Sequence, residues 1–249
     1  MMLENRHAFI TGGGTGIGLA IARALAKAGA QVTITGRRMD VLKAVETDQI
    51  HAIASDVTDE TQQVAAIAQA VAERGAINIC VANAGVAEGR SLQKTSTEFW
   101  RQIMATNLDG AFLTIRETMR SMLETDWGRV IAISSIAGVR GLKGGGAYSA
   151  SKHGVIGLIR SYSKDYVGNH ITFNAICPGY VDTPIIERNL EIIQNRGFSE
   201  DQAMDMMVSA NPHKQLIPPE EIAEAALWLC SPHSGAVNGQ TVEIAGGQI

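Results

Sequence analysis

The sequence predicts an α/β fold: a doubly wound parallel sheet of seven strands with helices on both faces. Two observations lead to this prediction. Apolar strand-like segments alternate with amphipathic helical segments through nearly all of the 249 residues, and several of the strand segments are apolar on both faces. Strands covered by helices on each side need apolar residues on both faces, and the alternation is that of β-α-β units. No linker or repeat interrupts it, so we expect a single domain spanning 1–249.

The expected strands are 7–11, 31–35, 49–54, 77–82, 129–134, 171–177 and 241–245. Between the first two, apolar residues over 17–28 follow helical spacing, and Gly29 is a typical helix terminator. The same pattern recurs over 64–71, before Gly75. It returns over 222–229, where Pro219 suits the first turn of a helix.

Residues 183–216 contain no expected strand and interrupt this rhythm. They predict one helix over about 185–195, ended by Gly197. Ser199, with Gln202 three positions later, predicts a second helix that begins with a capping box. A helical pair inserted before the last strand indicates a small lid over a substrate site. An interface or packing appendage is the alternative.

Composition argues against several classes of protein. Apolar residues make up 45 % and charged residues 18 % of the chain, a balance typical of a globular protein. The net charge is −4 with no basic stripe, so we expect no nucleic-acid partner. We find no apolar signal core and no run long enough to span a membrane, and therefore expect a cytoplasmic protein without a membrane partner. Cys80, Cys177 and Cys230 have no metal-binding spacing, so we expect reduced core residues and no catalytic metal.

A glycine-rich turn joins the first expected strand to the first helix. The segment TGGGTGIG (11–18) fits the pattern TGxxxGxG, with Thr11, Gly12, Gly16 and Gly18 at the fixed positions. Glycines let the backbone approach a pyrophosphate, and the N–H groups of the first helical turn, which includes Ile17, point at it. The turn therefore predicts a bound dinucleotide.

The end of the second expected strand indicates which dinucleotide is bound. A site for NAD usually has an acidic residue there, to hold the ribose hydroxyls. This chain has Arg37 and Arg38 instead. A guanidinium grips a 2′-phosphate that a carboxylate would repel. NADP(H) is therefore favoured. NAD(H) stays possible if the two arginines are only solvated and Asp40 takes the acidic role.

Tyr148 and Lys152 are four residues apart in AYSASK (147–152), and on a helix they would lie side by side. A nearby ammonium favours the phenolate and lowers the pKa of a tyrosine, which makes it a usable acid/base. TGxxxGxG joined to YxxxK resembles the classical short-chain dehydrogenase/reductase family. The resemblance covers essentially the whole chain and implies a Rossmann-type fold.

Further motifs of that family occur in order. They are Asp56 and Val57 in SDV, Asn83 and Gly85 in ANAG (with Ala82 in place of the family's first Asn), Asn107 in TNLDG, Ser135 in ISS, and Pro178, Gly179, Val181 and Thr183 in CPGYVDT. The resemblance implies that Tyr148 is the acid/base and that Lys152 holds the ribose. Ser135 would bind the substrate oxygen, with Ser134 as the alternative.

The resemblance also implies roles for the remaining motif residues. Asp56 holds the adenine, and the segment 178–183 holds the nicotinamide. Asn107 would sit at a helix kink and keep a water for proton relay. As an amide on an apolar stripe, it should in any case be bonded to backbone or water.

The CPGYVDTP stretch followed by a helical insertion looks like 3-oxoacyl-thioester and polyketide ketoreductases, and also like 3-hydroxybutyrate dehydrogenases. The leading hypothesis is reversible ketone/alcohol interconversion by hydride transfer on a 3-oxoacyl/3-hydroxyacyl compound, possibly an acyl thioester. One alternative is an NAD-dependent dehydrogenase of a small hydroxy acid or cyclic alcohol. Another is a non-enzymatic dinucleotide sensor. The resemblance further implies a homotetramer or homodimer.

Overall fold

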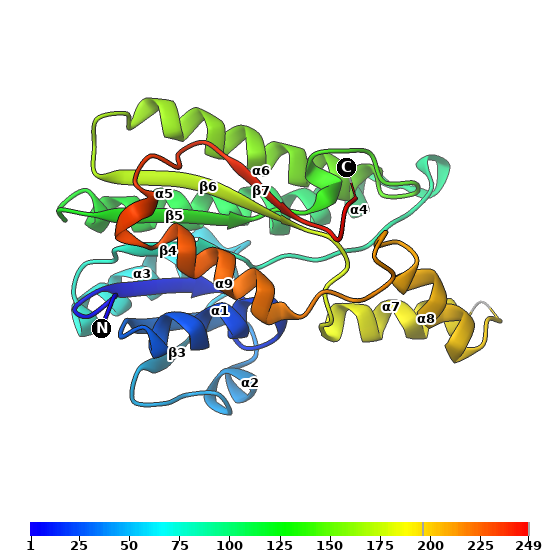
Figure 1. Cartoon of the computed structure of the whole chain (residues 1–249), viewed down its shortest axis with the longest axis horizontal. Coiled ribbons are helices and arrows are strands. Elements are labelled where there is room, and N and C mark those ends of the chain that lie inside the picture. Colours follow the sequence, from blue (N-terminus) through cyan, green and yellow to red (C-terminus); the bar gives the residue numbers. More distant parts are fainter. Residues whose placement is uncertain (196, 249) are drawn as a thin grey trace.

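A computed structural model describes residues 1–195 and 197–248. Within them, seven parallel strands form one sheet in the order β3-β2-β1-β4-β5-β6-β7 (Figure 1). The strands are β1 (His7–Thr11), β2 (Gln31–Gly36), β3 (Ile50–Ala54), β4 (Ile79–Ala82), β5 (Gly128–Ile133), β6 (Ile171–Pro178) and β7 (Thr241–Ile244). The predicted doubly wound α/β fold is confirmed. The strand order reverses direction at β1, so a crevice is expected at the carboxyl ends of β1 and β4.

Helices cover both faces of the sheet. They are α1 (Gly16–Lys27), α2 (Met39–Lys43), α3 (Glu60–Arg74), α4 (Thr97–Met104), α5 (Gly110–Met122), α6 (Gly146–Asp165), α7 (Pro184–Gln194), α8 (Glu200–Val208) and α9 (Pro219–Leu229). Helices α1 and α9 pack together on one face, whereas α3, α5 and α6 lie on the other.

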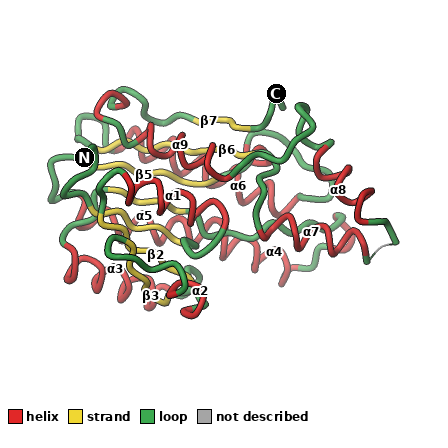
Figure 2. The backbone as a smooth tube through the Cα atoms, turned by 60° about the horizontal axis from the view of Figure 1, so that its bottom comes forward, coloured by secondary structure: helices red, strands yellow, loops and turns green. Residues whose placement is uncertain are grey.

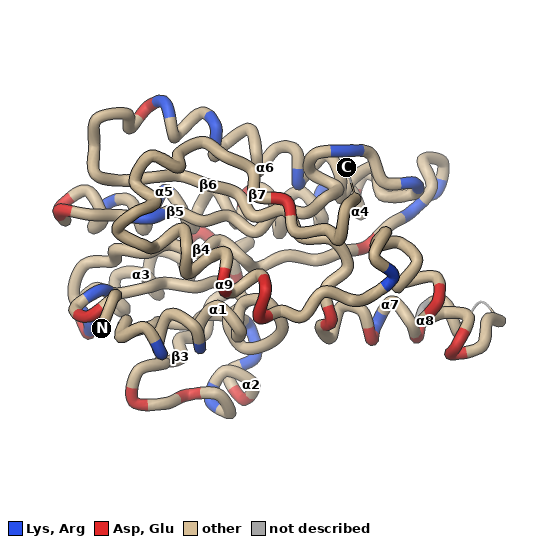
Figure 3. The backbone as a smooth tube through the Cα atoms, viewed as in Figure 1, with Lys and Arg blue, Asp and Glu red and all other residues tan. Residues whose placement is uncertain are grey.

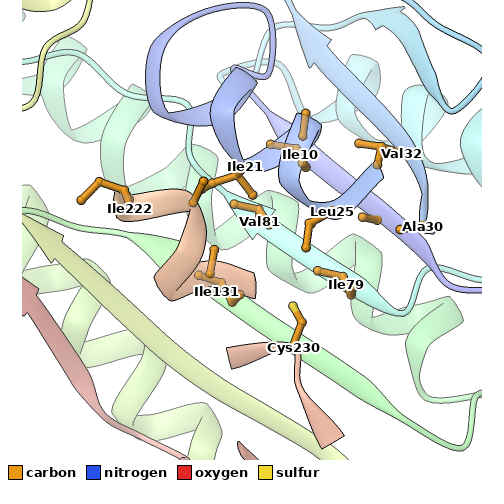
Figure 4. Packing of buried hydrophobic residues seen from close by; sticks show 14 of the residues in the cluster. Ile10, Ile21, Leu25, Ala30, Val32, Ile79, Val81, Ile131, Ile222 and Cys230 are labelled. Carbon is orange, nitrogen blue, oxygen red and sulfur yellow. The ribbon is translucent and has the colours of Figure 1, made fainter. Parts of the chain in front are cut away.

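Each face of the sheet has its own apolar core. On one side, Ile21 and Leu25 of α1 and Ile222 of α9 belong to the same buried cluster as Ile10 of β1 (Figure 4). The neighbouring Phe9 points to the opposite core, because successive strand residues alternate between faces. Burying one such large apolar side chain contributes roughly 1.5–3 kcal/mol, which explains why strands apolar on both faces select this layered arrangement.

A buried arginine joins the start of β5 to the end of α9. Arg129 donates from Nε to the carbonyl oxygen of Leu229 at 3.0 Å and from Nη1 to that of Gly128 at 2.9 Å. Its guanidinium carbon lies 4.4 Å from the centre of the Trp127 ring. Burial lowers the pKa of Arg129. The cation is compensated by the carbonyl end of a helix, where positive charge is favoured.

The helix that carries Asn107 contains a wider turn at this residue, where the resemblance implied a kink. The turn Ala105–Asp109, between α4 and α5, is π-helical. The buried positions that lead into this turn, Phe99, Ile103 and Asn107, are four residues apart. Trp100, which follows Phe99 in α4, is 40 % exposed. Single-residue π-type insertions of this kind often lie beside functional sites.

The two helices expected between β6 and β7 are present and extend beyond the carboxyl end of the sheet (Figure 2). Helix α8 begins with the predicted capping box, in which Gln202 N donates to Ser199 Oγ at 3.2 Å and Ser199 N donates to Gln202 Oε1 at 3.0 Å. Within the predicted segment 183–216, Arg196 lies outside the described residues, as does Ile249 at the end of the predicted domain 1–249. The lid role and the single-domain organisation remain predictions.

Candidate active site

A cavity of about 1030 Å³ opens at the carboxyl ends of the strands. It is lined by the start of α1, the residues that follow β2, β4, β5 and β6, the first turns of α6, and α7. Most of the motif residues predicted from the sequence reach it. They are Gly12, Gly16, Ile17, Gly18, Arg37, Arg38, Asp56, Val57, Asn83, Gly85, Ser135, Tyr148, Lys152, Pro178, Gly179, Val181 and Thr183.

The start of α1 forms one end of the cavity. Gly16 has a φ of +53°, and a Cβ on it would lie 3.1 Å from Thr183 Cγ2, so the tight turn depends on a glycine there. The N-cap residue Thr15 makes no side-chain cap, and the first-turn N–H groups have no partner within the helix. No acidic residue occupies this turn. These free donors at a helix N-terminus fit the pyrophosphate of a dinucleotide.

Thr11 and Asn83 fix this turn from behind. Thr11 Oγ1 accepts hydrogen bonds from the backbone N–H groups of Asn83 and Ala84, each at 3.1 Å. Asn83 Nδ2 in turn donates to the carbonyl oxygen of Thr11 at 2.8 Å. Thr11 is buried and does not line the cavity. Its contact with the dinucleotide stays a prediction; in the structure, Thr11 supports the turn by joining the ends of β1 and β4.

Two arginines mark the edge of the cavity beyond β2. Arg37 and Arg38 line it, are exposed, and form no ion pair with any residue that the structure describes. Asp40, the possible acidic substitute, is exposed in α2 and does not line the cavity. Asp56, on the neighbouring wall, accepts hydrogen bonds at Oδ1 from the N–H and hydroxyl of Thr58, at 2.9 and 2.8 Å.

Ser135 and Tyr148 meet at the floor of the cavity. Ser135 follows β5, where its Oγ accepts a hydrogen bond from Ala137 N at 3.1 Å and interacts with the Tyr148 side chain. Ser134, the alternative in the sequence, donates instead to the carbonyl oxygen of Lys152 at 3.0 Å. Of the two serines, Ser135 is thus the one whose hydroxyl reaches Tyr148.

Lys152 lies one turn beyond Tyr148 on α6, as the spacing predicts. Its Nζ is 5.9 Å from the centre of the Tyr148 ring and donates to the carbonyl oxygen of Ile133 at 2.8 Å. Burial lowers the pKa of Lys152 to about 8. Among the described residues, no carboxylate pairs with this ammonium.

The surroundings of Tyr148 act on its pKa in the direction opposite to our expectation. We expected Lys152 to lower the pKa of the phenol. Within the protein alone, burial raises the pKa of Tyr148, and the hydrogen bond with Ser135 only partly opposes this. The correction has a physical reason, because desolvation disfavours the phenolate and the ammonium alike. A charge-lowered phenol pKa would need a further positive charge beside the ring.

Asn107 lies behind the cavity wall. Its Oδ1 accepts from Val86 N at 2.8 Å, and its Nδ2 donates to Val86 O at 3.0 Å and to Ser151 Oγ at 3.1 Å. The expectation that this buried amide is bonded to backbone is confirmed. Ser151 was not predicted from the sequence. It lies between Tyr148 and Lys152, but a small polar residue at that place does not by itself indicate a role.

Several large apolar side chains also line the cavity. Its wall includes Val86, Leu142, Tyr180, Ile185 and Met207. Glu88, Lys143 and Arg188 add charge to it. Figure 3 shows basic and acidic residues interspersed over most elements, with mainly acidic residues on α7 and α8. In these two helices Arg188 is the one basic residue that the structure describes.

In the part of the chain that the structure describes, no group of three or more His, Cys, Asp or Glu side chains could hold a metal ion. No helix there is long and apolar enough to cross a membrane. Cys80, Cys177 and Cys230 are free and buried, and burial raises the pKa of the Cys80 thiol to about 12.

A family model described as short chain dehydrogenase matches residues 6–192. The chain belongs to this family. Membership confirms the predicted class of enzyme, an NAD(P)-dependent oxidoreductase that acts on CH–OH groups and interconverts ketones and alcohols. The predicted sensor without enzymatic activity is thereby disfavoured.

Similar family members have related names. D-beta-hydroxybutyrate dehydrogenase of Rhizobium meliloti is 36 % identical over 254 residues, covering 97 % of this chain and 98 % of the relative. A putative ketoacyl reductase of the granaticin polyketide synthase of Streptomyces violaceoruber is 34 % identical, with 96 % and 92 % covered. The solved structure of a variant of actinorhodin polyketide ketoreductase with NADPH has a TM-score of 0.92 at 31 % identity, with 97 % and 96 % covered.

Proposed function

We propose that the protein reversibly interconverts a 3-oxoacyl compound, such as an acyl thioester, and its 3-hydroxyacyl partner, with NADP(H) as the hydride carrier. One observation carries the proposal: Ser135, Tyr148 and Lys152 converge at the floor of a cavity whose other end is the glycine turn before α1. A dinucleotide laid along this cavity would place its pyrophosphate at the helix N-terminus and its nicotinamide beside Tyr148.

The proposed chemistry divides the reaction between carrier and side chains. The nicotinamide supplies or accepts the hydride. Tyr148 gives its hydroxyl proton to the carbonyl oxygen during reduction and takes it back from the alcohol during oxidation. Ser135 donates a hydrogen bond to the same substrate oxygen and stabilises the charge that develops on it. Lys152 holds the ribose, and its ammonium favours the phenolate of Tyr148 against the effect of burial.

The remaining motif residues are proposed to position the dinucleotide. Gly12, Gly16, Ile17 and Gly18 would face the pyrophosphate, Asp56 and Val57 the adenine, Asn83 and Gly85 the riboses, and Pro178, Gly179, Val181 and Thr183 the nicotinamide. Asn107 does not line the cavity, so we assign it a positioning role rather than contact with the reacting atoms.

Tyr148→Phe tests the catalytic assignment. We expect loss of turnover by at least about a thousandfold, since no other described hydroxyl combines contact with Ser135 and proximity to Lys152. The assay follows nicotinamide absorbance with 3-oxoacyl thioesters, acetoacetate and cyclic ketones. Cofactor affinity, measured by fluorescence titration, should change little. Tyr166→Phe, at the far end of α6, is the matched control. Turnover by Tyr148→Phe equal to that of the control would contradict the assignment.

The proposed preference for NADP(H) rests on Arg37 and Arg38, which line the cavity beyond β2 without ion-pair partners among the described residues. Arg37→Gln and Arg38→Gln should raise the KM for NADPH about tenfold or more and leave the KM for NADH within twofold. Arg160→Gln, exposed on α6, is the control. A clear preference of the unsubstituted protein for NADH would reverse this part of the proposal.

A second candidate substrate is a free 3-hydroxy acid, with NAD(H). It is favoured by the similarity to the Rhizobium meliloti dehydrogenase and by Lys143, a cation on the cavity wall that could meet a carboxylate. Parallel kcat/KM values for acetoacetate and for an acetoacetyl thioester separate the two candidates. A much higher value for the free acid would favour the second.

We also propose a cytoplasmic homotetramer or homodimer. Three free, buried cysteines fit a reducing compartment. Exposed apolar side chains on and next to α4, α5 and α6 (Trp100, Leu123 and Val167) fit a contact between copies of the chain. Light scattering gives the assembly mass, and fractionation of cells gives the compartment. A mass of one chain at micromolar concentration would contradict the assembly.

A further inference from the structure

We propose that Ser151 is a positioning residue for the reaction, which fixes the Asn107 amide and the first turn of α6 relative to each other. The inference rests on the proposed function, because it assigns an effect on turnover. Ser151 lies next to Lys152 in sequence and is fully buried. It does not line the cavity, so its effect acts through the residues that it holds.

The hydrogen bonds around Ser151 have only one arrangement of donors and acceptors. Its Oγ donates to the carbonyl oxygen of Tyr148 at 2.7 Å. A serine hydroxyl has one hydrogen, so the same oxygen must accept the bond from Asn107 Nδ2, at 3.1 Å. The second Nδ2 hydrogen goes to Val86 O, and Oδ1 accepts from Val86 N. Every hydrogen of this buried pair is therefore used.

This arrangement fixes which way the amide faces. A reversed amide would point Oδ1 at the Val86 carbonyl oxygen and Nδ2 at the Val86 N–H, and both bonds would become repulsive. It would also turn an acceptor toward Ser151, whose hydrogen is already committed to Tyr148. Ser151 thus adds a third contact that holds one orientation of Asn107, at a site where an unmade hydrogen bond is costly.

The pair joins three elements beside the reacting groups. Asn107 belongs to the π turn, Val86 to the loop after β4, and Ser151 to α6. A Cβ on Gly85 would lie 3.1 Å from Asn107 Oδ1 and 3.4 Å from Lys152 Nζ, so the amide and the ammonium flank one glycine. Movement of the amide would therefore displace both Gly85, which lines the cavity, and Lys152.

The same helix contains a matched control. Ser163, also buried, donates from Oγ to the carbonyl oxygen three residues back, that of Arg160, at 2.9 Å. Its hydroxyl has no side-chain hydrogen bond to any described residue. Ser151→Ala and Ser163→Ala each remove one buried hydroxyl with an i−3 bond. Only the first also removes the partner of an amide beside the active site.

The first measurement is steady-state kinetics of the full chain with both substrates varied. Ser151→Ala should lower kcat about tenfold, with the KM for the dinucleotide within twofold of the unsubstituted protein. Ser163→Ala should keep kcat within twofold, although both variants lose some thermal stability. Equal kcat values for the two variants would overturn the inference and leave the proposed function intact. A parallel rise of KM without loss of kcat would overturn it as well.

The second measurement needs no turnover and so separates this inference from the proposed function. In protein labelled with ¹⁵N-asparagine, the side-chain amide hydrogens of Asn107 should exchange slowly with solvent. Ser151→Ala should speed their exchange at least tenfold, and Ser163→Ala should not. Unchanged exchange in Ser151→Ala would overturn the inference even in an active enzyme. Faster exchange in Ser151→Ala alone would support the positioning contact even if no substrate tried is turned over.

Discussion

Arg188 on α7 and Glu88 in the loop after β4 form an ion pair on the cavity wall, with 3.2 Å between Nη2 and Oε1. The side chain of Glu88 is 30 % exposed and that of Arg188 is 66 % exposed. Such an exposed guanidinium makes the pair worth at most about 1 kcal/mol of stability. Its larger effect is electrostatic, because it places a negative charge beside the position proposed for the substrate and neutralises the one described cation of α7.

Glu88→Gln should therefore change selectivity by charge. Removing the carboxylate frees Arg188, so the KM for an anionic substrate such as acetoacetate should fall about fivefold, which corresponds to about 1 kcal/mol. The KM for a neutral cyclic ketone should stay within twofold. Glu191→Gln, exposed on the same helix, is the control. Equal changes for the anionic and the neutral substrate would show that the pair only shapes the cavity.

Lys152→Met should abolish turnover but make the folded protein more stable. The pKa of Lys152 is about 8 in the folded protein, against 10.5 without burial, a difference worth about 3 kcal/mol. The lost hydrogen bond to Ile133 O destabilises the variant by about 1 kcal/mol. The free energy of unfolding at pH 7 should therefore be about 2 kcal/mol higher in the variant than in the unsubstituted protein.

The size of this effect depends on pH within a defined window. Between pH 8 and 10.5 the unfolded chain binds more protons at Lys152 than the folded one, so the penalty shrinks as pH rises. Urea unfolding at pH 7 and pH 10 measures it, with Lys164→Met, exposed on α6, as the control. A variant less stable than the unsubstituted protein at pH 7 would contradict the prediction.

His7 should make the protein sensitive to mild acid. Its Nδ1 donates to Gly75 O at 2.9 Å, and its Nε2 accepts from the Thr33 hydroxyl at 2.9 Å, so the neutral ring is the bonded form. Burial lowers the pKa of His7 from 6.5 to about 4. Between these values the unfolded chain binds the extra proton, and stability falls as pH falls.

For this single histidine, the loss between pH 7 and pH 5 amounts to about 2 kcal/mol. His7→Gln should be less stable at pH 7 but lose about 2 kcal/mol less between these two pH values, measured by urea unfolding. His233→Gln, exposed after α9, should keep the full slope. An unchanged slope in His7→Gln would mean that the ring is protonated in the folded state.

Gly16→Ala should damage cofactor binding through backbone strain. The position has a φ of +53°, and the added methyl would lie 3.1 Å from Thr183 Cγ2. We expect dinucleotide affinity, measured by calorimetry, to fall at least tenfold and stability to fall by about 1–2 kcal/mol. Gly157→Ala, an exposed helical position with no atom within 4 Å of the new methyl, should bind normally and gain about 0.5–1 kcal/mol. Equal affinities for the two variants would contradict the proposed pyrophosphate site.

The sheet could be predicted because the alternation of apolar strands and amphipathic helices repeats along the chain. Most of the cavity could be predicted because it is lined by motif residues that few other residue types can replace. Strands apolar on both faces leave few arrangements open, and the glycines before α1 are needed for its turn. The resemblance implied a helix kink at Asn107, but the π-helical form of that turn was not predicted, because apolar positions four residues apart also fit an ordinary helix. Motif spacing placed Thr11 correctly along the chain, but it cannot tell whether a side chain faces the cavity or the next strand.

Other features depend on contacts that no local pattern encodes. Glu88 and Arg188 are 100 residues apart in sequence and meet only because α7 lies over the loop after β4. The direction of the Tyr148 pKa shift depends on burial, which outweighs the hydrogen bond with Ser135 and is known only from the fold. Ser151 has an ordinary residue type, and only its partner Asn107 gives it significance.

Arg129 secures the end of α9 with carbonyl oxygens rather than with an acid. Protonation at low pH releases carboxylate partners, and added salt screens them, but neither treatment weakens a carbonyl in this way. The joint between β5 and α9 therefore persists under acidic and saline conditions that open surface ion pairs such as Arg6–Asp126. The amino end of β5, opposite the cavity at the carboxyl ends of the strands, is thus held to α9 by a hydrogen bond whose acceptor does not titrate.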